Sequence, residues 1–283
     1  MATPFGPDGS LDLDGVQKVA KHLVAQGHDG LVVSGTTGES PTTTTAEDGA
    51  ILAAVKDAVG DRAKVVAGVG TNSTAHSVEL AEQAAKVGVD GLLLVTPYYN
   101  KPGQAGVLHH FTEVCRASDV PVMLYDVPGR TGTQISLETF EAAKRLDTVV
   151  AVKDAVGDFA RGVHLTQLGY AVYSGDDISN LAWLAHGAVG FVSVVGHAAG
   201  VQTKAMADAF WAGDSAEALT IFSRLLPAID AVMGVQNYGA TTAKAALQLL
   251  GVLDNRNVRA PLVPLTDDEV LALRAGLAAS GLL

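Results

Sequence analysis

Lys153 is the residue of this sequence best placed for covalent chemistry. It directly follows the apolar run 149–152, and the two-residue period of a strand puts it on the same face as Val149 and Ala151. If that face is the interior of the fold, the ammonium is partly desolvated, which lowers the pKa of a lysine and frees its amine as a nucleophile. The alternative is a surface lysine whose charged head extends from the strand end into water. Lys101 is the only rival at a strand end, and its polar loop predicts a solvated, protonated amine.

The turn 35–39, Gly-Thr-Thr-Gly-Glu, has the residue types of an anion-binding loop between a strand and a helix. Its glycines allow tight backbone geometry, and its N–H groups and hydroxyls can hold a carboxylate. A helix N-terminus capped by threonine explains the same residues without any ligand, so both readings stay open. The turn is not a phosphate loop, because no lysine follows the glycines.

Two tyrosine-containing segments supply groups for proton transfer. Tyr125 and Arg130 flank a Pro-Gly turn; a tyrosine that ends a strand can relay protons, and a nearby arginine can bind a carboxylate. A core tyrosine with an exposed arginine is the alternative. Tyr98 and Tyr99 are adjacent and so point in opposite directions, which predicts that one packs while the other reaches a site or a subunit interface.

The acidic pair Asp176 and Asp177, together with His186 and His197, raises the question of a metal site. The spacing of these residues matches no established ligand set. We therefore expect the segment 174–177, Ser-Gly-Asp-Asp, to cap a helix.

The elements that must position these residues alternate between short apolar runs and helical segments. The apolar runs are 31–33, 65–69, 92–95, 122–125, 149–152, 171–173 and 190–195. The segments between them repeat apolar residues every three or four positions, which is typical of helices. Strand–helix alternation predicts a parallel sheet with right-handed crossovers, and strands this apolar are expected when both faces are covered.

These units predict an α/β protein, a (β/α)8 TIM barrel with a small C-terminal helical region. Residues 1–212 would form the barrel and residues 213–283 the helical region, with helices over 216–233, 240–250 and 266–279. Residues 1–5 look like the tail of an eighth strand whose earlier residues are absent, so the first strand is expected to be truncated. In such barrels function collects in the loops after the strand carboxyl ends. Those loops are 34–40, 68–72, 95–102, 125–132, 152–158, 173–179 and 193–198, and they hold every candidate above except His186.

The composition excludes several classes of function. A formal net charge of −11 argues against nucleic-acid binding, and any anionic substrate must be attracted by a few local cations. The single cysteine, Cys115, excludes an intramolecular disulfide and a Cys-rich metal site, and it is expected to be a buried thiol on a helix. No apolar run approaches the roughly 18 residues of a membrane span, and no signal-peptide pattern is visible. We expect a cytoplasmic protein.

Five motifs in order resemble the dihydrodipicolinate synthase family of pyruvate-dependent class I aldolases. They are Gly35-Thr36-Thr37-Gly38-Glu39, Val95-Thr96-Pro97-Tyr98-Tyr99, Tyr125-Asp126-Val127-Pro128-Gly129-Arg130-Thr131-Gly132, Lys153-Asp154-Ala155 and Ser174-Gly175-Asp176-Asp177. The resemblance runs nearly end to end. It implies condensation of pyruvate with L-aspartate 4-semialdehyde in lysine and diaminopimelate biosynthesis, without a metal or organic cofactor.

The resemblance also implies a role for each matched residue. Lys153 would form the Schiff base with pyruvate, and Thr37 would hold the pyruvate carboxylate. The proton relay would consist of Thr36, Tyr125 and Tyr99, with Tyr99 supplied by a neighbouring subunit of a homotetramer built as a dimer of dimers. Arg130 would bind the carboxylate of the semialdehyde. Backbone carbonyls near Gly175 and Val192 would complete the pocket.

The sequence departs from the family pattern at several positions. Asp126 stands where many members carry Asn, which adds a charge near the expected site that Arg130 could neutralise. His76, Thr45 and Asp48 stand where lysine-inhibited members carry Glu and two His, so we predict weak or absent inhibition by L-lysine.

The nearest alternatives are N-acetylneuraminate lyase and 2-keto-3-deoxy-sugar-acid aldolases of the same superfamily. Those enzymes typically have Gly-Ser-Thr-Gly-Glu at the turn, where this sequence has Gly-Thr-Thr-Gly-Glu. They also generally lack an arginine that matches Arg130. A barrel that only binds keto acids or regulates is a different class, and intact Lys153, Tyr125 and Thr36 argue against it.

Overall fold

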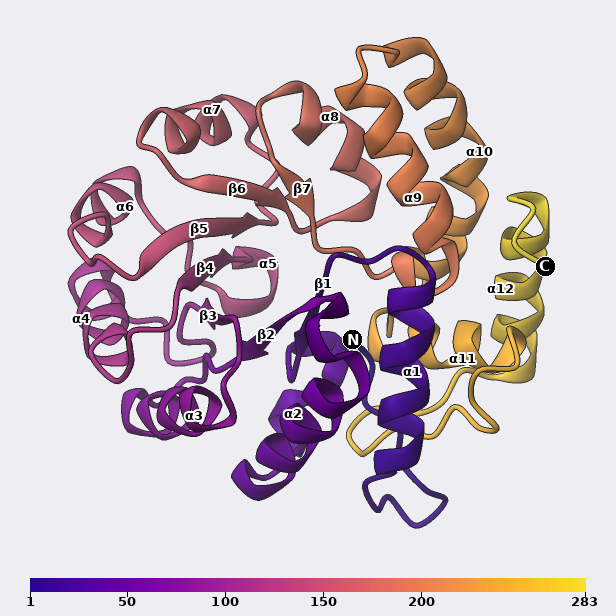
Figure 1. The fold of residues 1–283 in the computed structure, drawn as a ribbon, viewed down its shortest axis with the longest axis horizontal. Helices are drawn as coiled ribbons and strands as arrows, with labels where there is room; N and C mark the ends of the chain where they lie inside the picture. The colour runs from indigo at the N-terminus through magenta and orange to yellow at the C-terminus, as the bar shows by residue number, and fades with distance from the viewer. The chain divides into compact units, whose positions relative to one another are not determined.

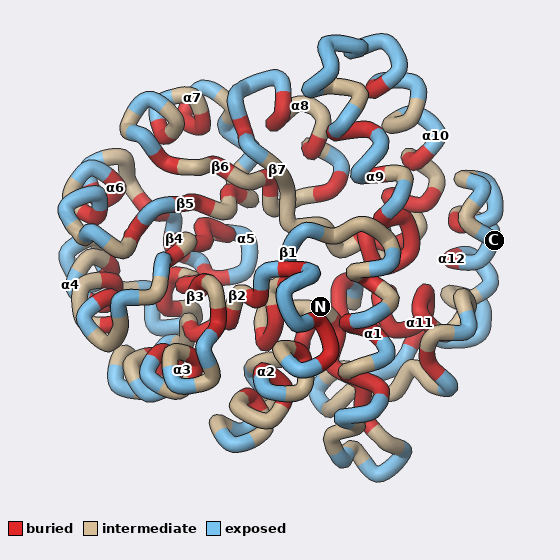
Figure 2. The backbone as a smooth tube through the Cα atoms, in the orientation of Figure 1, coloured by how far each residue is buried: buried red, intermediate tan, exposed pale blue.

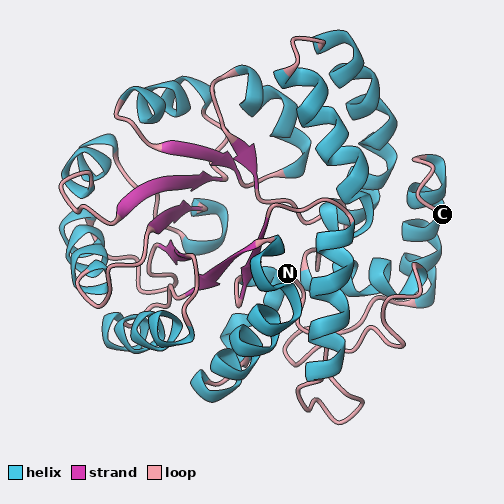
Figure 3. Ribbon diagram, viewed as in Figure 1, coloured by secondary structure: helices cyan, strands magenta, loops and turns pink.

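The computed structural model covers residues 1–283 and divides into two compact units. Unit 1 consists of residues 1–64 and 193–283, and unit 2 consists of residues 65–192. Helices and strands are distinguished by colour in Figure 3. None of the helices combines the length and the apolar composition needed to cross a membrane.

Unit 2 is a parallel sheet whose strands follow one another in sequence order. The strands are β2 (Lys64–Gly68, its first residue in unit 1), β3 (Gly91–Val95), β4 (Val122–Asp126), β5 (Val149–Asp154), β6 (Ala171–Ser174) and β7 (Gly190–Phe191). The helices are α3 (Thr74–Val87), α4 (Gln104–Cys115), α5 (Pro128–Thr131), α6 (Leu137–Ala143), α7 (Phe159–Gln167) and α8 (Asn180–Ala185), with the 3-10 turn η4 (Asp177–Ser179). Figure 1 shows α3, α4, α6 and α7 along one side of these strands.

Strands β3 and β4 of unit 2 are largely buried, as the red stretches of Figure 2 show. Four of the five residues of β3 are buried, as expected for a parallel strand covered on both faces. Local signals set the helices between the strands: Ser73 caps α3 through its side chain, and Gly88 ends that helix with a φ of 80°. Each crossover thus returns the chain to the next parallel strand.

The register of β4, β5 and β6 puts side chains of two kinds on opposite faces of the sheet. Tyr125 pairs with Lys153, and Lys153 pairs with Tyr173. The next residues along, Asp126 and Asp154, also pair with each other. Because successive side chains of a strand alternate between faces, the tyrosines and the lysine share one face and the two aspartates share the other.

A register shift interrupts β5 before this point. Val149 pairs with Val122, but the next pair joins Met123 to Ala151, so Val150 is left out and is 45% exposed. The strand period therefore holds from Ala151 to Lys153, as predicted, but does not extend back without interruption.

Unit 1 contains one complete strand and most of the long helices. Its elements are α1 (Leu13–Ala25), β1 (Gly30–Val33), η1 (Thr36–Gly38), η2 (Ser40–Thr42), α2 (Thr45–Val59), η3 (Gly60–Arg62), α9 (Gly196–Trp211), α10 (Ser215–Met233), α11 (Ala240–Leu249) and α12 (Asp267–Ala279). Buried residues from 195 to 277 form an apolar core shared by α9 to α12. Helix α12 packs tightly on α10 at Gly276. A Cβ added there would overlap the Ala231 Cβ and lie 2.6 Å from the Pro227 carbonyl oxygen, so only glycine fits.

The predicted elements are largely confirmed. All seven apolar runs contain strands, although the last is only two residues long. The three predicted C-terminal helices are α10, α11 and α12. The domain boundary at residue 212 stays a prediction, since residues 193–283 belong to one compact unit. Residues 1–5 form no eighth strand: Phe5 makes an isolated bridge with Leu11, and the Met1 ammonium donates to the Val32 carbonyl at 2.6 Å. The chain is an α/β protein with a parallel sheet.

Candidate active site

Lys153 is a partly buried amine beside an aromatic ring at the carboxyl end of β5. Its Nζ lies 4.1 Å from the centroid of the Tyr125 ring, which is only 7% exposed. Burial lowers the pKa of Lys153 to about 8; the negative charge of Asp177 opposes this, and the positive charge of Arg130 adds to it. The predicted desolvation of this amine is therefore confirmed, and the surface alternative is wrong. An amine with such a pKa is a usable nucleophile near neutral pH.

Backbone contacts at the ends of β5 and β6 fix the surroundings of the lysine. A Cβ at Gly175 would lie 3.1 Å from Lys153 Cε and 3.0 Å from the Asp154 carbonyl oxygen. The Gly175 N–H donates to that carbonyl at 2.7 Å, and the Val192 N–H donates to the Ser174 carbonyl at 2.8 Å. The chain at Gly175 thus passes directly against the side chain of the lysine.

The acidic pair after β6 is not a helix cap in the expected sense. Asp176 occupies the N-cap position of η4, but its carboxylate makes no capping hydrogen bond. Asp177 is buried and accepts a 3.0 Å hydrogen bond from the Asn180 side chain. Its charge favours the protonated form of Lys153.

The two histidines considered with that pair have structural surroundings. His186 stacks on Phe159 with ring centroids 4.8 Å apart. His197 is buried in unit 1, accepts from the Ala2 N–H at 3.0 Å, and has its pKa lowered by burial to about 3. No group of three or more His, Cys, Asp and Glu side chains is arranged to hold a metal ion.

Arg130 and the tyrosine pair occupy loops of unit 2. Arg130 lies in the short helix α5 and is exposed. Tyr98 is half-buried, and burial raises its pKa, whereas Tyr99 is 88% exposed with a φ of 73°. One tyrosine packs, as predicted, and the other faces outward; that it reaches a site or a subunit interface stays a prediction. Lys101 is exposed, also as predicted.

Asp126 corrects one expectation from the sequence. It points away from the face of Tyr125 and Lys153, is fully buried, and forms an ion pair with Arg161 of α7. It adds no charge on the side of the lysine, and the cation that pairs with it is Arg161, not Arg130. The expectation failed because the sheet alternation places consecutive residues on opposite faces.

Thr36 and Thr37 belong to unit 1, in the turn η1 after β1. Thr36 is exposed and Thr37 half-buried. The N-cap of η1 is Gly35, with no side-chain capping bond, and the cap of α2 is Thr44, which forms a capping box with Glu47. The capping alternative for Thr36 and Thr37 is therefore wrong.

Two buried cations that form ion pairs in the structure, Lys244 and Arg161, were not predicted from the sequence. Lys244 forms a buried ion pair with Glu39, the last residue of the Gly-Thr-Thr-Gly-Glu motif, and Arg161 bridges Asp126 and Asp154. The only signal for Lys244 was a lone charge within the small-residue segment 240–247. No sequence pattern predicted Arg161, because its partners Asp126 and Asp154 lie on two different strands and come together only when the strands pair.

Cys115 is buried, as predicted, and burial raises the pKa of its thiol. A buried thiol with a raised pKa is a poor nucleophile. Lys244 is also buried with a lowered pKa, but it is held in an ion pair with Glu39. By contrast, the cation of Lys153 forms no such pair and lies against the Tyr125 ring.

Comparisons with known proteins agree with this chemistry. The family model described as the dihydrodipicolinate synthetase family matches residues 1–280. A 4-hydroxy-tetrahydrodipicolinate synthase of Kineococcus radiotolerans is 54% identical over 283 residues, which cover 100% of this chain and 92% of the relative. One of Streptomyces coelicolor is 54% identical over 282 residues, 99% of this chain and 93% of the relative.

Solved structures give the same assignment. A dihydrodipicolinate synthase of Cyanidioschyzon merolae, solved with lysine bound, has a TM-score of 0.96 at 37% identity and covers 100% of this chain and 97% of its own. One of Bacillus anthracis has a TM-score of 0.94 at 39% identity, with 98% and 95% covered. The chain therefore belongs to the dihydrodipicolinate synthetase family, whose members are aldolase-type lyases.

Proposed function

We propose that the chain condenses pyruvate with L-aspartate 4-semialdehyde to give 4-hydroxy-tetrahydrodipicolinate, a step of lysine and diaminopimelate biosynthesis. The observation that carries this proposal is the amine of Lys153, 4.1 Å from the Tyr125 ring centroid and with its pKa lowered to about 8 by burial. At pH 7 roughly a tenth of such amines are unprotonated, against fewer than one in a thousand for an ordinary lysine.

The chemistry begins at the keto carbon of pyruvate. The Lys153 amine adds to this carbon, one water leaves, and the resulting iminium accepts electrons from the neighbouring methyl group. The methyl loses a proton, and the enamine attacks the aldehyde carbon of the second substrate, forming a carbon–carbon bond. The amino group of that substrate then displaces the lysine and closes the ring, so the lysine returns to its starting state. Overall the two substrates lose one water.

Each proton in this sequence needs a positioned donor or acceptor. We assign the relay to Tyr125, Thr36 and Tyr99, because hydroxyl groups transfer protons without adding charge to the site. Thr37 would hold the pyruvate carboxylate, and Arg130 the carboxylate of the semialdehyde. Carbonyls near Gly175 and Val192 would complete the pocket. No metal or organic cofactor enters the proposal.

We infer a (β/α)8 barrel over residues 1–212 with a helical region over 213–283, supported by the high TM-scores of the solved relatives. The 88% exposure of Tyr99 supports its use by a neighbouring subunit in a homotetramer. The biosynthetic role of the named relatives supports a cytoplasmic location.

The deciding experiment is borohydride reduction with pyruvate, followed by intact mass spectrometry. The wild type is expected to gain the mass of one reduced pyruvate, and K153A is expected to gain nothing. Condensation is then measured with aspartate semialdehyde and with a panel of sugar acids. An adduct that survives in K153A would refute the Schiff base, and cleavage of sialic acid would refute the choice of substrate.

A further inference from the structure

A buried cluster of three charges lies behind the proposed site, on the opposite face of β4 and β5. Arg161 of α7 donates from Nη1 to the Asp154 carboxylate at 2.6 Å and from Nη2 to the Asp126 carboxylate. The arginine side chain is 7% exposed, and the two carboxylates are fully buried. We call Asp126, Asp154 and Arg161 the rear triad.

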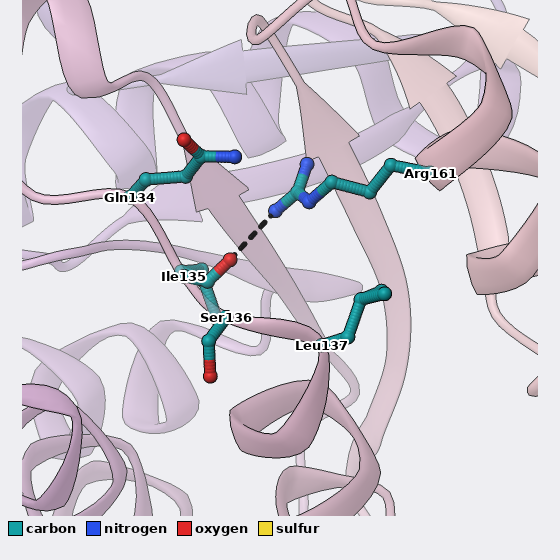
Figure 4. Close-up of a pocket in the computed structure, with 5 residues that line it drawn as sticks. All are labelled: Gln134, Ile135, Ser136, Leu137 and Arg161. Carbon is teal, nitrogen blue, oxygen red and sulfur yellow. Dashed lines mark hydrogen bonds between the residues drawn. The ribbon is translucent and has the colours of Figure 1, made fainter.

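The rear triad is tied to the chain around it as well. Arg161 Nη2 donates to the Ile135 carbonyl at 2.9 Å, and the Ile135 N–H donates back to the Asp126 carboxylate at 3.2 Å. Asp154 accepts from the Val156 N–H at 2.8 Å. Figure 4 shows the guanidinium turned toward Ile135 beside a pocket of about 330 Å³, lined by residues 134–137 and Arg161. The arginine therefore joins α7, the loop before α6 and the ends of two strands.

Each carboxylate of the rear triad is the direct neighbour of a residue assigned to the reaction. Asp126 follows Tyr125 on β4, and Asp154 follows Lys153 on β5. Asp126 pairs with Asp154 in the strand register just as Tyr125 pairs with Lys153. A fixed separation of the two carboxylates on one face thus fixes the separation of the tyrosine and the lysine on the other.

We propose that Arg161 is a positioning residue, which holds the ends of β4 and β5 together and so holds the Lys153 amine in place over the Tyr125 ring. This rests on the proposed function, in which that lysine carries the substrate. The planar fork of the guanidinium suits this role, because its two terminal nitrogens bind two carboxylates at once. A lysine at position 161 would keep the positive charge. Its side chain is shorter, however, and its single terminal nitrogen would not reach both carboxylates.

The test compares D126N with R161K/D126N. Both variants carry one cation and one carboxylate in the rear triad, so they have the same net charge and differ only in the fork. The measurement is the rate of borohydride-trapped adduct formation with pyruvate across pH 6 to 10, together with the melting temperature. R116M, which breaks the exposed pair between Arg116 and Glu113, is the control and is expected to behave as the wild type.

We expect R161K/D126N to form the adduct roughly tenfold more slowly than D126N, about 1.4 kcal/mol in the barrier. The midpoint of its pH profile should move upward, because an amine displaced from its buried place regains water and its pKa rises. A role in folding alone would lower the melting temperature without moving this midpoint. Equal rates and equal midpoints in the two folded variants would overturn the proposal.

If R161K/D126N does not fold, D154A replaces it in the same titration. This variant leaves Arg161 paired with Asp126 and frees the end of β5, so the rate should fall and the midpoint should rise. A wild-type profile in D154A overturns the proposal. Failure of the proposed function itself is a separate result, because the wild type would then form no adduct.

Discussion

At the residue scale, Gly175 sets how closely the backbone after β6 approaches Lys153. A Cβ at this position would lie 3.1 Å from Lys153 Cε and 3.0 Å from a carbonyl oxygen, closer than side chains usually pack. We predict that G175A displaces the lysine and lowers kcat about tenfold, with less than about 2 kcal/mol lost in stability. The matched control is G103A, whose added Cβ would meet nothing within 4 Å. Wild-type kcat in G175A would show that the lysine tolerates displacement.

Asp126 makes the stability of the protein depend on pH. Burial raises the pKa of Asp126 to about 6, with Arg161 acting in the opposite direction. The folded protein therefore binds this proton more tightly than the unfolded chain does, and the stability contributed by Asp126 falls as pH rises from about 4 to 6. We expect D126N to have the higher free energy of unfolding at pH 8, by at most about 3 kcal/mol.

The same comparison at pH 4 is the control for this prediction. Asp126 is protonated there in the folded protein, so D126N and the wild type should unfold at nearly the same denaturant concentration. A difference that is equal at both pH values, or a less stable D126N at pH 8, would contradict the assignment of the raised pKa to this residue.

Residue spacing predicted the desolvation of Lys153 but could not predict the residues that support it. The lysine follows an apolar strand, and that position alone implies desolvation. Arg161 lies on a helix and gains its role from Asp126 and Asp154, which adjoin it only once the strands pair. The chain separation of 35 residues between Arg161 and Asp126 leaves no local pattern to detect.

At the element scale, the strands were predictable because each is an apolar run bounded by turns, and a parallel sheet needs little else. The short last strand was overestimated: residues 190–195 are apolar, but only Gly190 and Phe191 pair with β6. The turn η1 shows a different limit. Its sequence fitted both a cap and a carboxylate loop, and only the location of the true cap of α2 at Thr44 excludes the first.

The turn after β1 depends on an element far away in the chain. Glu39, with a φ of 60°, forms a buried ion pair with Lys244 of α11 and accepts from the Arg259 N–H at 2.9 Å. The Lys244 amine and the Arg259 guanidinium each lie 4.2 Å from the centroid of the Phe5 ring. The helix α11 thus anchors the end of the segment that carries Thr36.

We predict that K244M strongly destabilises the protein, because it leaves the Glu39 carboxylate buried without its cation. Breaking one partner of a buried pair costs about 3–5 kcal/mol. The measurement is chemical unfolding, with K204M as the matched control: Lys204 pairs with Asp208 on an exposed helix surface, where such a pair contributes about 0.5 kcal/mol or less. Equal stability of K244M and K204M would show that Glu39 finds another partner.

At the scale of the whole molecule, the family relation raises the question of feedback control. The related synthase of Cyanidioschyzon merolae was solved with lysine bound. In this chain Asp48 is buried and accepts from the Thr43 hydroxyl at 2.8 Å. His76, Thr45 and Asp48 stand where lysine-inhibited members are expected to carry Glu and two His.

We predict that sub-millimolar L-lysine leaves the rate of condensation unchanged, because the residues at positions 45, 48 and 76 do not supply the groups of a lysine-inhibited enzyme. The measurement is the condensation rate with L-lysine added, and with D-lysine as the control for ionic strength. A fall in rate with the L isomer alone would refute the prediction.

We predict that Tyr99 acts in the site of a neighbouring subunit. This aromatic side chain is 88% exposed in the isolated chain, although Tyr99 is assigned to the proton relay. Large aromatic groups are enriched where subunits meet. The exposure of Tyr99 and its assignment to the proton relay agree if the tyrosine enters the site of a neighbouring subunit.

Mixing two inactive variants separates this arrangement from one in which Tyr99 acts within its own chain. A dimer of one K153A subunit and one Y99F subunit has one intact site only if the tyrosine crosses the interface, since that site then combines Lys153 of one chain with Tyr99 of the other. Random reassociation of equal amounts should restore about a quarter of wild-type activity, because half of the dimers are mixed and each has one working site of two. If Tyr99 serves its own subunit, every site in the mixture lacks one residue, and no activity should return.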